Sequence, residues 1–107
     1  MTGVLSRWCG ALLFTGVLTS SVSPAFGADA KNGERLAIRW CGACHVVVSD
    51  QRQSARDVIP FREIARRPDF DAGRLAFFLL NPHPVMPDMG LSRAEATDLA
   101  AYIASLK

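Results

Sequence analysis

Two cysteines and a histidine lie within five consecutive residues, Cys41-Gly42-Ala43-Cys44-His45. On a helical turn, residues three and four positions apart face the same way, so Cys41, Cys44 and His45 can all meet one flat ligand. Two thiols can form thioether bonds to the vinyl groups of a haem, while the imidazole points at its iron. The C-x-x-C-H spacing is therefore typical of covalent c-type haem attachment.

Three other interpretations of this cysteine pair stay open at this point. A zinc site needs four ligands, and the only further candidate is His83. A thioredoxin-like redox pair also uses C-x-x-C, but it belongs beside a βαβ pattern, and the sequence has none. A structural disulfide between Cys41 and Cys44 would close a tiny loop and constrain little of the unfolded chain.

A haem iron in an electron carrier needs a second axial ligand, and a thioether raises its reduction potential. The candidates are Met86, Met89 and His83. Met86 lies in a proline-stiffened stretch, which can hold a side chain at a fixed distance with little entropy left to lose. We therefore expect His45 and Met86 to bind the iron. Ligation by His83 would instead give a bis-histidine haem of lower potential.

The first residues have the layout of a secretory signal peptide. Arg7 precedes an apolar run, Ala11 to Leu18, and small residues lie two apart at Ala25 and Gly27. The apolar run is shorter than the roughly 20 residues that span a bilayer. We expect residues 1–27 to be cleaved and the protein to be exported to the periplasm, with an uncleaved membrane anchor as the alternative. Cys9 would be discarded with this leader.

The remaining residues, 28–107, form one small domain. A chain of this length builds a marginal core and usually needs a disulfide, metal or cofactor to hold it. The whole sequence carries 12 Lys and Arg residues against 10 Asp and Glu residues. Acidic residues lie among the arginines of the middle segment, which indicates a mixed solvated surface and not a nucleic-acid interface.

The sequence predicts an all-α domain of about four helices. Asp29 is a candidate N-cap for a helix over residues 31–40, in which Gly33 indicates a close crossing by another helix. A surface loop is expected at residues 49–58 and a short helix around Phe61, ended by Pro68. Asp71 is a candidate N-cap for a helix that runs to about Leu80.

A stiff, extended loop follows, because three prolines in residues 81–87 each remove an amide donor and restrict φ. The last helix has the clearest signal. Ser92 and Glu95 form a capping box. The expected apolar face of this helix consists of Ala96, Leu99, Ala100, Ile103 and Leu106.

Taken together, these features resemble the class I cytochrome c family over essentially all of residues 28–107. The resemblance is carried by a helix that runs into Cys41–His45, by Pro60-Phe61, by Met86-Pro87, and by Leu91-Ser92 at the start of a C-terminal helix. The lysine-rich surface of mitochondrial members is missing.

The resemblance implies the cytochrome c fold, with about four short helices around one covalently bound haem. It implies that the first and last helices cross, with Gly33 and Ala37 packed against Leu99 and Tyr102. It also implies that the carbonyl of a proline after the haem motif, for which Pro60 is the candidate, accepts a hydrogen bond from Nδ1 of His45.

The expected function is single-electron transfer by a small, monomeric, exported monohaem cytochrome c that is not an enzyme. Its partners would be periplasmic or membrane redox proteins. Two alternatives are a haem subunit of a larger periplasmic oxidoreductase and an open-site haem protein with peroxidase or gas-binding activity. The apolar side chains expected to surround the haem are Leu36, Trp40, Phe61, Leu75, Phe78, Leu79 and Ile103.

Overall fold

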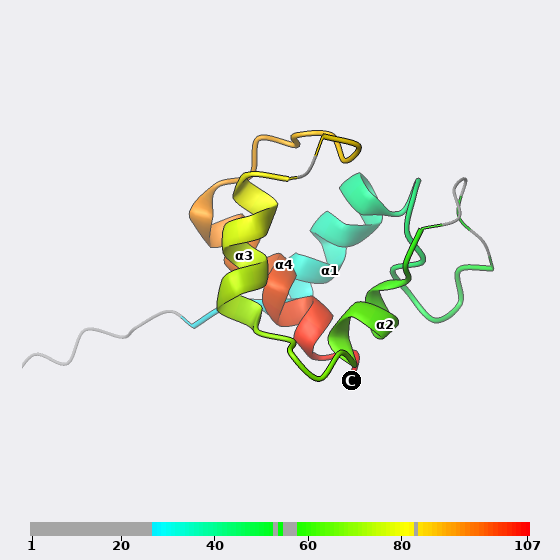
Figure 1. Cartoon of the computed structure of the whole chain (residues 1–107). Helices are drawn as coiled ribbons and strands as arrows, with labels where there is room; N and C mark the ends of the chain where they lie inside the picture. The colour runs from blue at the N-terminus through cyan, green and yellow to red at the C-terminus, as the bar shows by residue number, and fades with distance from the viewer. Residues whose placement is uncertain (1–26, 53, 55–57, 83) are drawn as a thin grey trace, which may run out of the picture.

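The computed structural model describes residues 27–52, 54, 58–82 and 84–107, and this part of the chain is helical without any strand. Its elements are α1 (Ala30–Leu36), a π-helical turn η1 (Ala37–Cys41), α2 (Phe61–Ala65), α3 (Ala72–Leu80) and α4 (Arg93–Ala104) (Figure 1). The predicted all-α fold is confirmed. The predicted leader lies almost entirely in residues 1–26, outside the described residues. None of the described helices has the length and apolar character needed to cross a membrane.

The first helix begins at its predicted cap and changes form before its predicted end. The Asp29 carboxylate accepts hydrogen bonds from the amides of Lys31 and Asn32, at 2.9 and 3.0 Å. The regular α-helix ends at Leu36, and the chain continues as the wider turn η1. The prediction of one uniform helix over residues 31–40 is therefore only partly right. This widened turn leads directly into the cysteine motif.

A glycine fits the end of this wide turn. The amide of Gly42 donates to the carbonyl of Ala37, five residues earlier, at 3.0 Å. A Cβ atom at position 42 would lie only 3.0 Å from the carbonyl oxygen of Ile38. Glycine avoids this close contact, so the chain can leave the helix here without moving its last turn.

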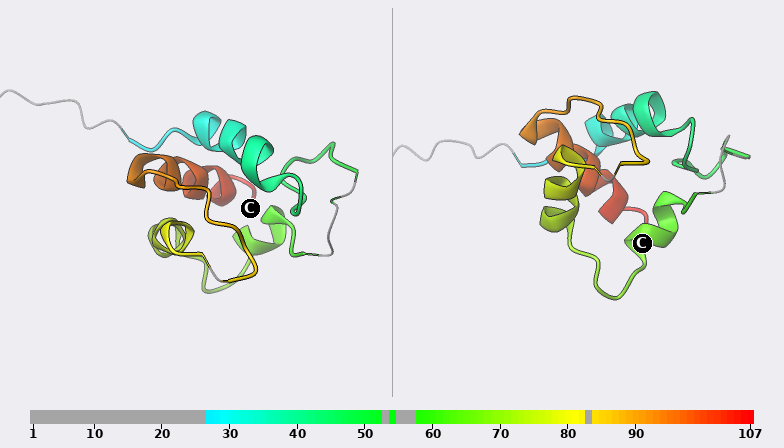
Figure 2. Two further views of the ribbon diagram at one scale, coloured as in Figure 1. Left: turned by 90° about the horizontal axis from the view of Figure 1, so that it is seen from above. Right: turned by 45° about the horizontal axis from the view of Figure 1, so that its top comes forward.

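Helices α1 and α4 pack side by side in both views of Figure 2. A Cβ atom at Gly33 would overlap the main-chain carbonyl of Asp98 and lie 2.8 Å from the Cβ atom of Tyr102. The expected close crossing is confirmed, although Asp98 and not Leu99 provides the nearest atoms. The Asp98 carboxylate adds hydrogen bonds to the Asp29 amide (2.7 Å) and to the Asn32 side chain (2.9 Å).

Helix α4 begins with the predicted capping box. The Glu95 amide donates to Oγ of Ser92 at 3.2 Å, and the Ser92 amide donates to the Glu95 carboxylate at 2.8 Å. Four of its predicted apolar residues are buried, and the fifth, Leu106, lies beyond the helix and is half-buried. Tyr102 is also buried, and its hydroxyl is satisfied because it donates to the Val47 carbonyl at 2.6 Å.

Asp71 is the N-cap of α3, as predicted, and its carboxylate accepts a hydrogen bond from the Arg74 amide at 2.6 Å. It packs against α4 and ends at Leu80. The proline-rich segment then returns across one end of the helices toward α4 (Figure 1). The helices thus form a frame that holds two irregular segments, one after η1 and one after α3.

Candidate functional site

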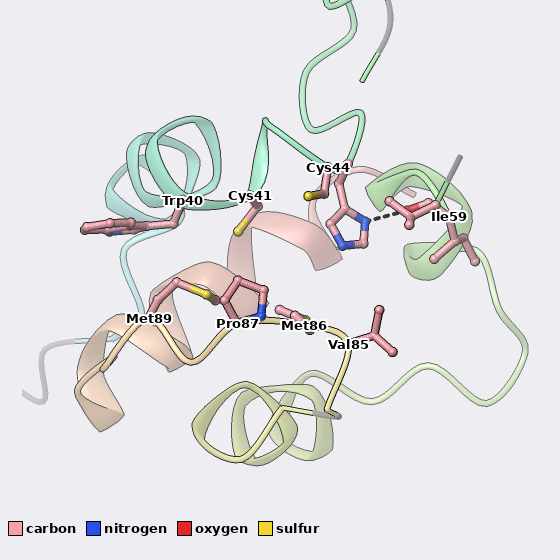
Figure 3. Close-up of a pocket in the computed structure, with 10 residues that line it drawn as sticks. Trp40, Cys41, Cys44, Ile59, Val85, Met86, Pro87 and Met89 are labelled. Atoms are coloured by element: carbon pink, nitrogen blue, oxygen red, sulfur yellow. Dashed lines mark hydrogen bonds between the residues drawn. The ribbon is translucent and has the colours of Figure 1, made fainter. Parts of the chain in front are cut away.

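The two irregular segments face each other across a cavity of about 460 Å³, which is within the range typical of small-molecule sites. All four residues predicted for the site, Cys41, Cys44, His45 and Met86, line this cavity. They come from two stretches that are far apart in sequence. The complete lining is Trp40, Cys41, Cys44, His45, Val58, Ile59, Val85, Met86, Pro87 and Met89 (Figure 3).

The two cysteines are free thiols on one side of the cavity. Figure 3 shows both side chains above Met86 and Pro87. Cys41 is buried and Cys44 is half-buried. Burial, and secondarily the nearby Cys44, raises the pKa of Cys41 to about 11. Cys41 is therefore a neutral thiol at neutral pH.

His45 has one ring nitrogen already committed to the protein. Its Nδ1 lies 2.7 Å from the carbonyl oxygen of Ile59, and the dashed line in Figure 3 marks this hydrogen bond. A carbonyl oxygen only accepts, so Nδ1 carries the proton and donates. In the neutral tautomer that donates through Nδ1, the second nitrogen, Nε2, keeps its lone pair and can bind a metal.

The acceptor for His45 is Ile59 and not the predicted Pro60. The Pro60 carbonyl accepts instead from the amides of Glu63 and Ile64, at 3.0 and 3.2 Å, because Pro60 is the N-cap of α2. The carbonyl one residue earlier is left to meet the histidine. A following proline biases Ile59 toward an extended conformation. The N-cap position of Pro60, which the sequence prediction did not include, is what leaves the Ile59 carbonyl as the acceptor.

Packing also restrains the imidazole ring. The buried ring of Phe61 lies 5.2 Å from the ring of His45, centroid to centroid, with an interplanar angle of 47°. The Phe61 amide in turn donates to the Val46 carbonyl at 3.0 Å, next to the histidine. The first residue of α2 therefore holds His45 through its ring and through the neighbouring main chain.

Two methionines lie on the other side of the cavity. Met86 and Met89 are both half-buried and both line it, and Figure 3 shows them on the loop across from the cysteines. Met86 also packs against the hydrophobic core. Gly90 ends this stretch with a φ of 62°, a conformation that favours glycine. The third candidate ligand, His83, lies outside the described residues.

The apolar surroundings of the cavity differ from those expected. Of the expected residues, Trp40 lines the cavity, whereas the others belong to the core, pack against it, or, like Phe78, are exposed. The lining residues that the sequence did not indicate are Val58, Ile59, Val85 and Pro87. They lie in irregular segments, where no helical periodicity marks a buried face.

The donor set fits haem c. Two free thiols, an imidazole with an available Nε2 and a methionine thioether share one cavity, whose remaining lining is mostly apolar. In the described part of the chain, no group of three or more His, Cys, Asp or Glu side chains is arranged to hold a metal ion. The zinc interpretation therefore gains no support from the described residues.

One known protein is closely similar to this chain. The chain is 56% identical over 90 residues to cytochrome c-552 of Bradyrhizobium diazoefficiens, and the match covers 84% of this chain and 86% of the relative. No family model matches the chain, and no solved structure matches it either. Because the identity is high and extends over most of both proteins, the chain belongs to the small class I c-type cytochromes, which carry covalently bound haem c.

Proposed function

We propose that this cytochrome is a monohaem electron carrier in which Cys41 and Cys44 form the thioethers and His45 and Met86 are the axial ligands. The observation that carries the proposal is the shared cavity, which brings the cysteine motif and the proline-rich loop together. When bound, the haem supplies the one-electron redox chemistry. The protein supplies ligation, burial and orientation.

The chain's own residues divide this work between the two sides of the cavity. The Ile59 carbonyl keeps the proton of His45 on Nδ1, so Nε2 stays available as a ligand. Met86 supplies a thioether, which favours a higher reduction potential than a second histidine would. A site that keeps the same two ligands in both oxidation states needs little rearrangement during electron transfer.

Met86 is a better candidate than Met89 for a physical reason. Pro84 and Pro87 flank it closely and limit the conformations of the loop even before the ligand binds. Met86 also contacts the core, which restrains its side chain from the protein side. Met89, by contrast, precedes the conformationally free Gly90.

The proposal places the mature protein in the periplasm, as residues 28–107, after cleavage of a signal peptide formed by residues 1–27. Support comes from the sequence of the leader and from the cysteine motif, since c-type haem is attached in an exported compartment. The partners would be redox proteins that dock briefly, a type of contact with a small interface.

The test is the optical spectrum of the oxidised protein, expressed at full length in a host that attaches c-type haem. Methionine ligation gives a weak far-red band from charge transfer between sulfur and ferric iron. We expect the band in the wild type, its loss in Met86→Ala, and its retention in the matched control Met89→Ala.

The other outcomes separate the parts of the proposal. Loss of the band in Met89→Ala alone would assign the ligand to Met89. Covalent haem without the band in the wild type would exclude methionine ligation and favour His83 or an open site, with peroxidase or gas binding as the function. The lack of covalent haem would refute the proposal as a whole.

A further inference from the structure

Gln51, in the loop after the cysteine motif, makes three hydrogen bonds to the main chain around His45. Its side-chain Oε1 accepts from the Val47 amide at 2.9 Å. Its Nε2 donates to the carbonyls of Gly42 and His45, at 3.0 and 2.8 Å. One half-buried side chain thus joins both ends of the segment 42–47. The sequence alone placed Gln51 in a plain surface loop.

The chemistry of this segment explains why a glutamine suits the position. Residues 42–47 have no helical or strand ladder, so their amides and carbonyls need other partners when they are shielded from water. A glutamine side chain offers one acceptor and two N–H donors. These match one amide and two carbonyls, and the side chain satisfies all three. A glutamate of the same size could only accept, and it would face two carbonyl oxygens.

One of these three bonds completes the restraint of His45. Its amide donates to the Cys41 carbonyl at 2.9 Å, and its ring donates to the Ile59 carbonyl at 2.7 Å. Gln51 binds the remaining main-chain group, the His45 carbonyl. The histidine is therefore held at its amide, its carbonyl and its ring. Of these three contacts, the bond to its carbonyl is the one that a side-chain substitution can remove.

We propose that Gln51 is a positioning residue that holds segment 42–47 and thereby sets the orientation of the His45 ring plane in the haem-loaded protein. This inference rests on the proposed ligation by His45. Groups outside the metal's own ligands commonly orient a ligating histidine, usually through its ring. Gln51 would do so through the main chain that carries the ring.

The experiment is proton NMR of the ferric, haem-loaded protein. The shifts of the haem methyl groups depend on the orientation of the axial ligands. The variants are Gln51→Glu, which keeps the volume but removes both donors, and Gln51→Leu, which removes all three hydrogen bonds. The matched control is Asp50→Ala, because Asp50 is the exposed neighbour of Gln51.

We expect both Gln51 variants to redistribute the haem methyl shifts, with Asp50→Ala retaining the wild-type pattern. We also expect hydrogen exchange of the Val47 amide to become about tenfold faster in Gln51→Leu, since that amide loses its partner. The pattern of methyl shifts is the deciding measurement. If Gln51 contributed only to stability, its substitution would lower the melting temperature and leave the methyl shifts unchanged.

Unchanged methyl shifts in both Gln51 variants would overturn the inference, whatever happens to the melting temperature. Failure of both variants to acquire haem would also overturn it, because a positioning residue leaves attachment intact. A wild type without covalent haem would refute the proposed function itself. A normal wild type with unaffected variants would refute the role of Gln51 alone.

Discussion

The two sides of the cavity are held in different ways. Hydrogen bonds join the cysteine side, residues 41–47, to the adjacent loop and to more distant parts of the chain. These come from Gln51, the Ile59 carbonyl, the Phe61 amide at the start of α2 and the Tyr102 hydroxyl on α4. On the methionine side, residues 81–90, the hydrogen bonds that the structure describes are local. The Asn81 amide donates to the Phe78 carbonyl, and the Gly90 amide donates to the Asp88 carboxylate.

This difference indicates which interactions restrain each proposed ligand. On the cysteine side, many directional bonds hold His45, so losing one leaves the others. On the methionine side, prolines limit the conformations of the loop and lower the entropy that ordering costs. Among the described residues, opening this loop breaks fewer long-range hydrogen bonds than moving the cysteine side does. We therefore expect Met86 to be the more exchangeable of the two ligands.

The largest effect should follow from removing the covalent links on the cysteine side. In Cys41→Ser/Cys44→Ser, we expect no haem to remain attached in a denaturing gel and most of the helical circular dichroism to be lost. The reason is that so small a domain buries too little apolar surface to be stable without its cofactor.

The matched control for the double variant is Cys9→Ser, because Cys9 lies in the predicted signal peptide and should not affect attachment. A haem signal in the gel from the double variant would contradict the assignment of the two thioethers. A loss of haem in Cys9→Ser would show that the leader is not simply discarded.

The next effect concerns the crossing of α1 and α4, which connects the two sides. Helix α1 leads to the cysteines, and α4 follows the methionine loop. In Gly33→Ala, the added Cβ would overlap the Asp98 carbonyl, so the helices must move apart. We expect the free energy of unfolding to fall by about 1–3 kcal/mol in a denaturant titration, as for other overpacked sites.

Gly73→Ala is the matched control for this prediction, since it also adds one methyl group to a helix. A Cβ there would meet only the Asp71 carboxylate, at 3.4 Å. We expect a gain in the free energy of unfolding of at most about 1 kcal/mol, from better helix propensity. Equal responses of the two glycine variants would show that the crossing is not tightly packed.

An effect of similar size tests one long-range bond of the cysteine side. In Tyr102→Phe, the Val47 carbonyl loses the buried hydroxyl that donates to it at 2.6 Å. We expect the free energy of unfolding to fall by about 1–3 kcal/mol at neutral pH, the usual cost of an unpaired buried acceptor. Thermal melts of the oxidised protein would measure this change. A loss well below that range would show that water replaces the hydroxyl.

The same variant has a pH signature. Burial, and then the charge of Glu34, raises the pKa of the Tyr102 hydroxyl. The folded state therefore keeps this proton at a pH where the unfolded chain releases it. The contribution of Tyr102 is complete below the unfolded pKa, about 10, and is lost as the pH rises further. We expect Tyr102→Phe to melt with a weaker dependence on pH in this alkaline range.

The sequence was most informative where local chemistry decides the structure. Asp29, Asp71 and Ser92 cap their helices as predicted, because a cap depends only on residues a few positions away. The spacing of the cysteine motif likewise indicated residues that share one cavity. Gly33 correctly indicated a close helix crossing, because a buried glycine inside a helix needs a reason of this kind.

The sequence was least informative where the backbone departs from regular helices. The wide turn before Cys41, the hydrogen bonds of Gln51 and the cavity lining by Val58 lie in such backbone, where no periodic pattern marks them. The acceptor of the His45 proton is an intermediate case. The family resemblance implied the carbonyl of Pro60, which was wrong by one residue, because Pro60 is the N-cap of α2 and its carbonyl accepts from the amides of that helix.

The smallest effect compares the proline next to Met86 with the proline next to Ile59, whose carbonyl accepts the hydrogen bond from His45. In Pro87→Ala, the loop next to Met86 gains conformations in its open state, which favours release of the thioether. A proline restricts the open chain by about 0.4–1 kcal/mol, so we expect imidazole to displace the methionine with an apparent affinity about two- to fivefold higher. Loss of the far-red band during an imidazole titration of the ferric protein measures this.

Pro60→Ala is the counterpart beside the residue that holds the His45 ring. It frees the chain at Ile59 to a similar degree, but the hydrogen bonds from the His45 ring to the Ile59 carbonyl and from the Phe61 amide to the Val46 carbonyl remain. We therefore expect the imidazole titration to match the wild type, with only a small fall in melting temperature. If both variants shifted the titration equally, the two sides of the cavity would open together when imidazole displaces the methionine. The contrast between a ligand held by hydrogen bonds and a ligand held by a stiff loop would then be wrong.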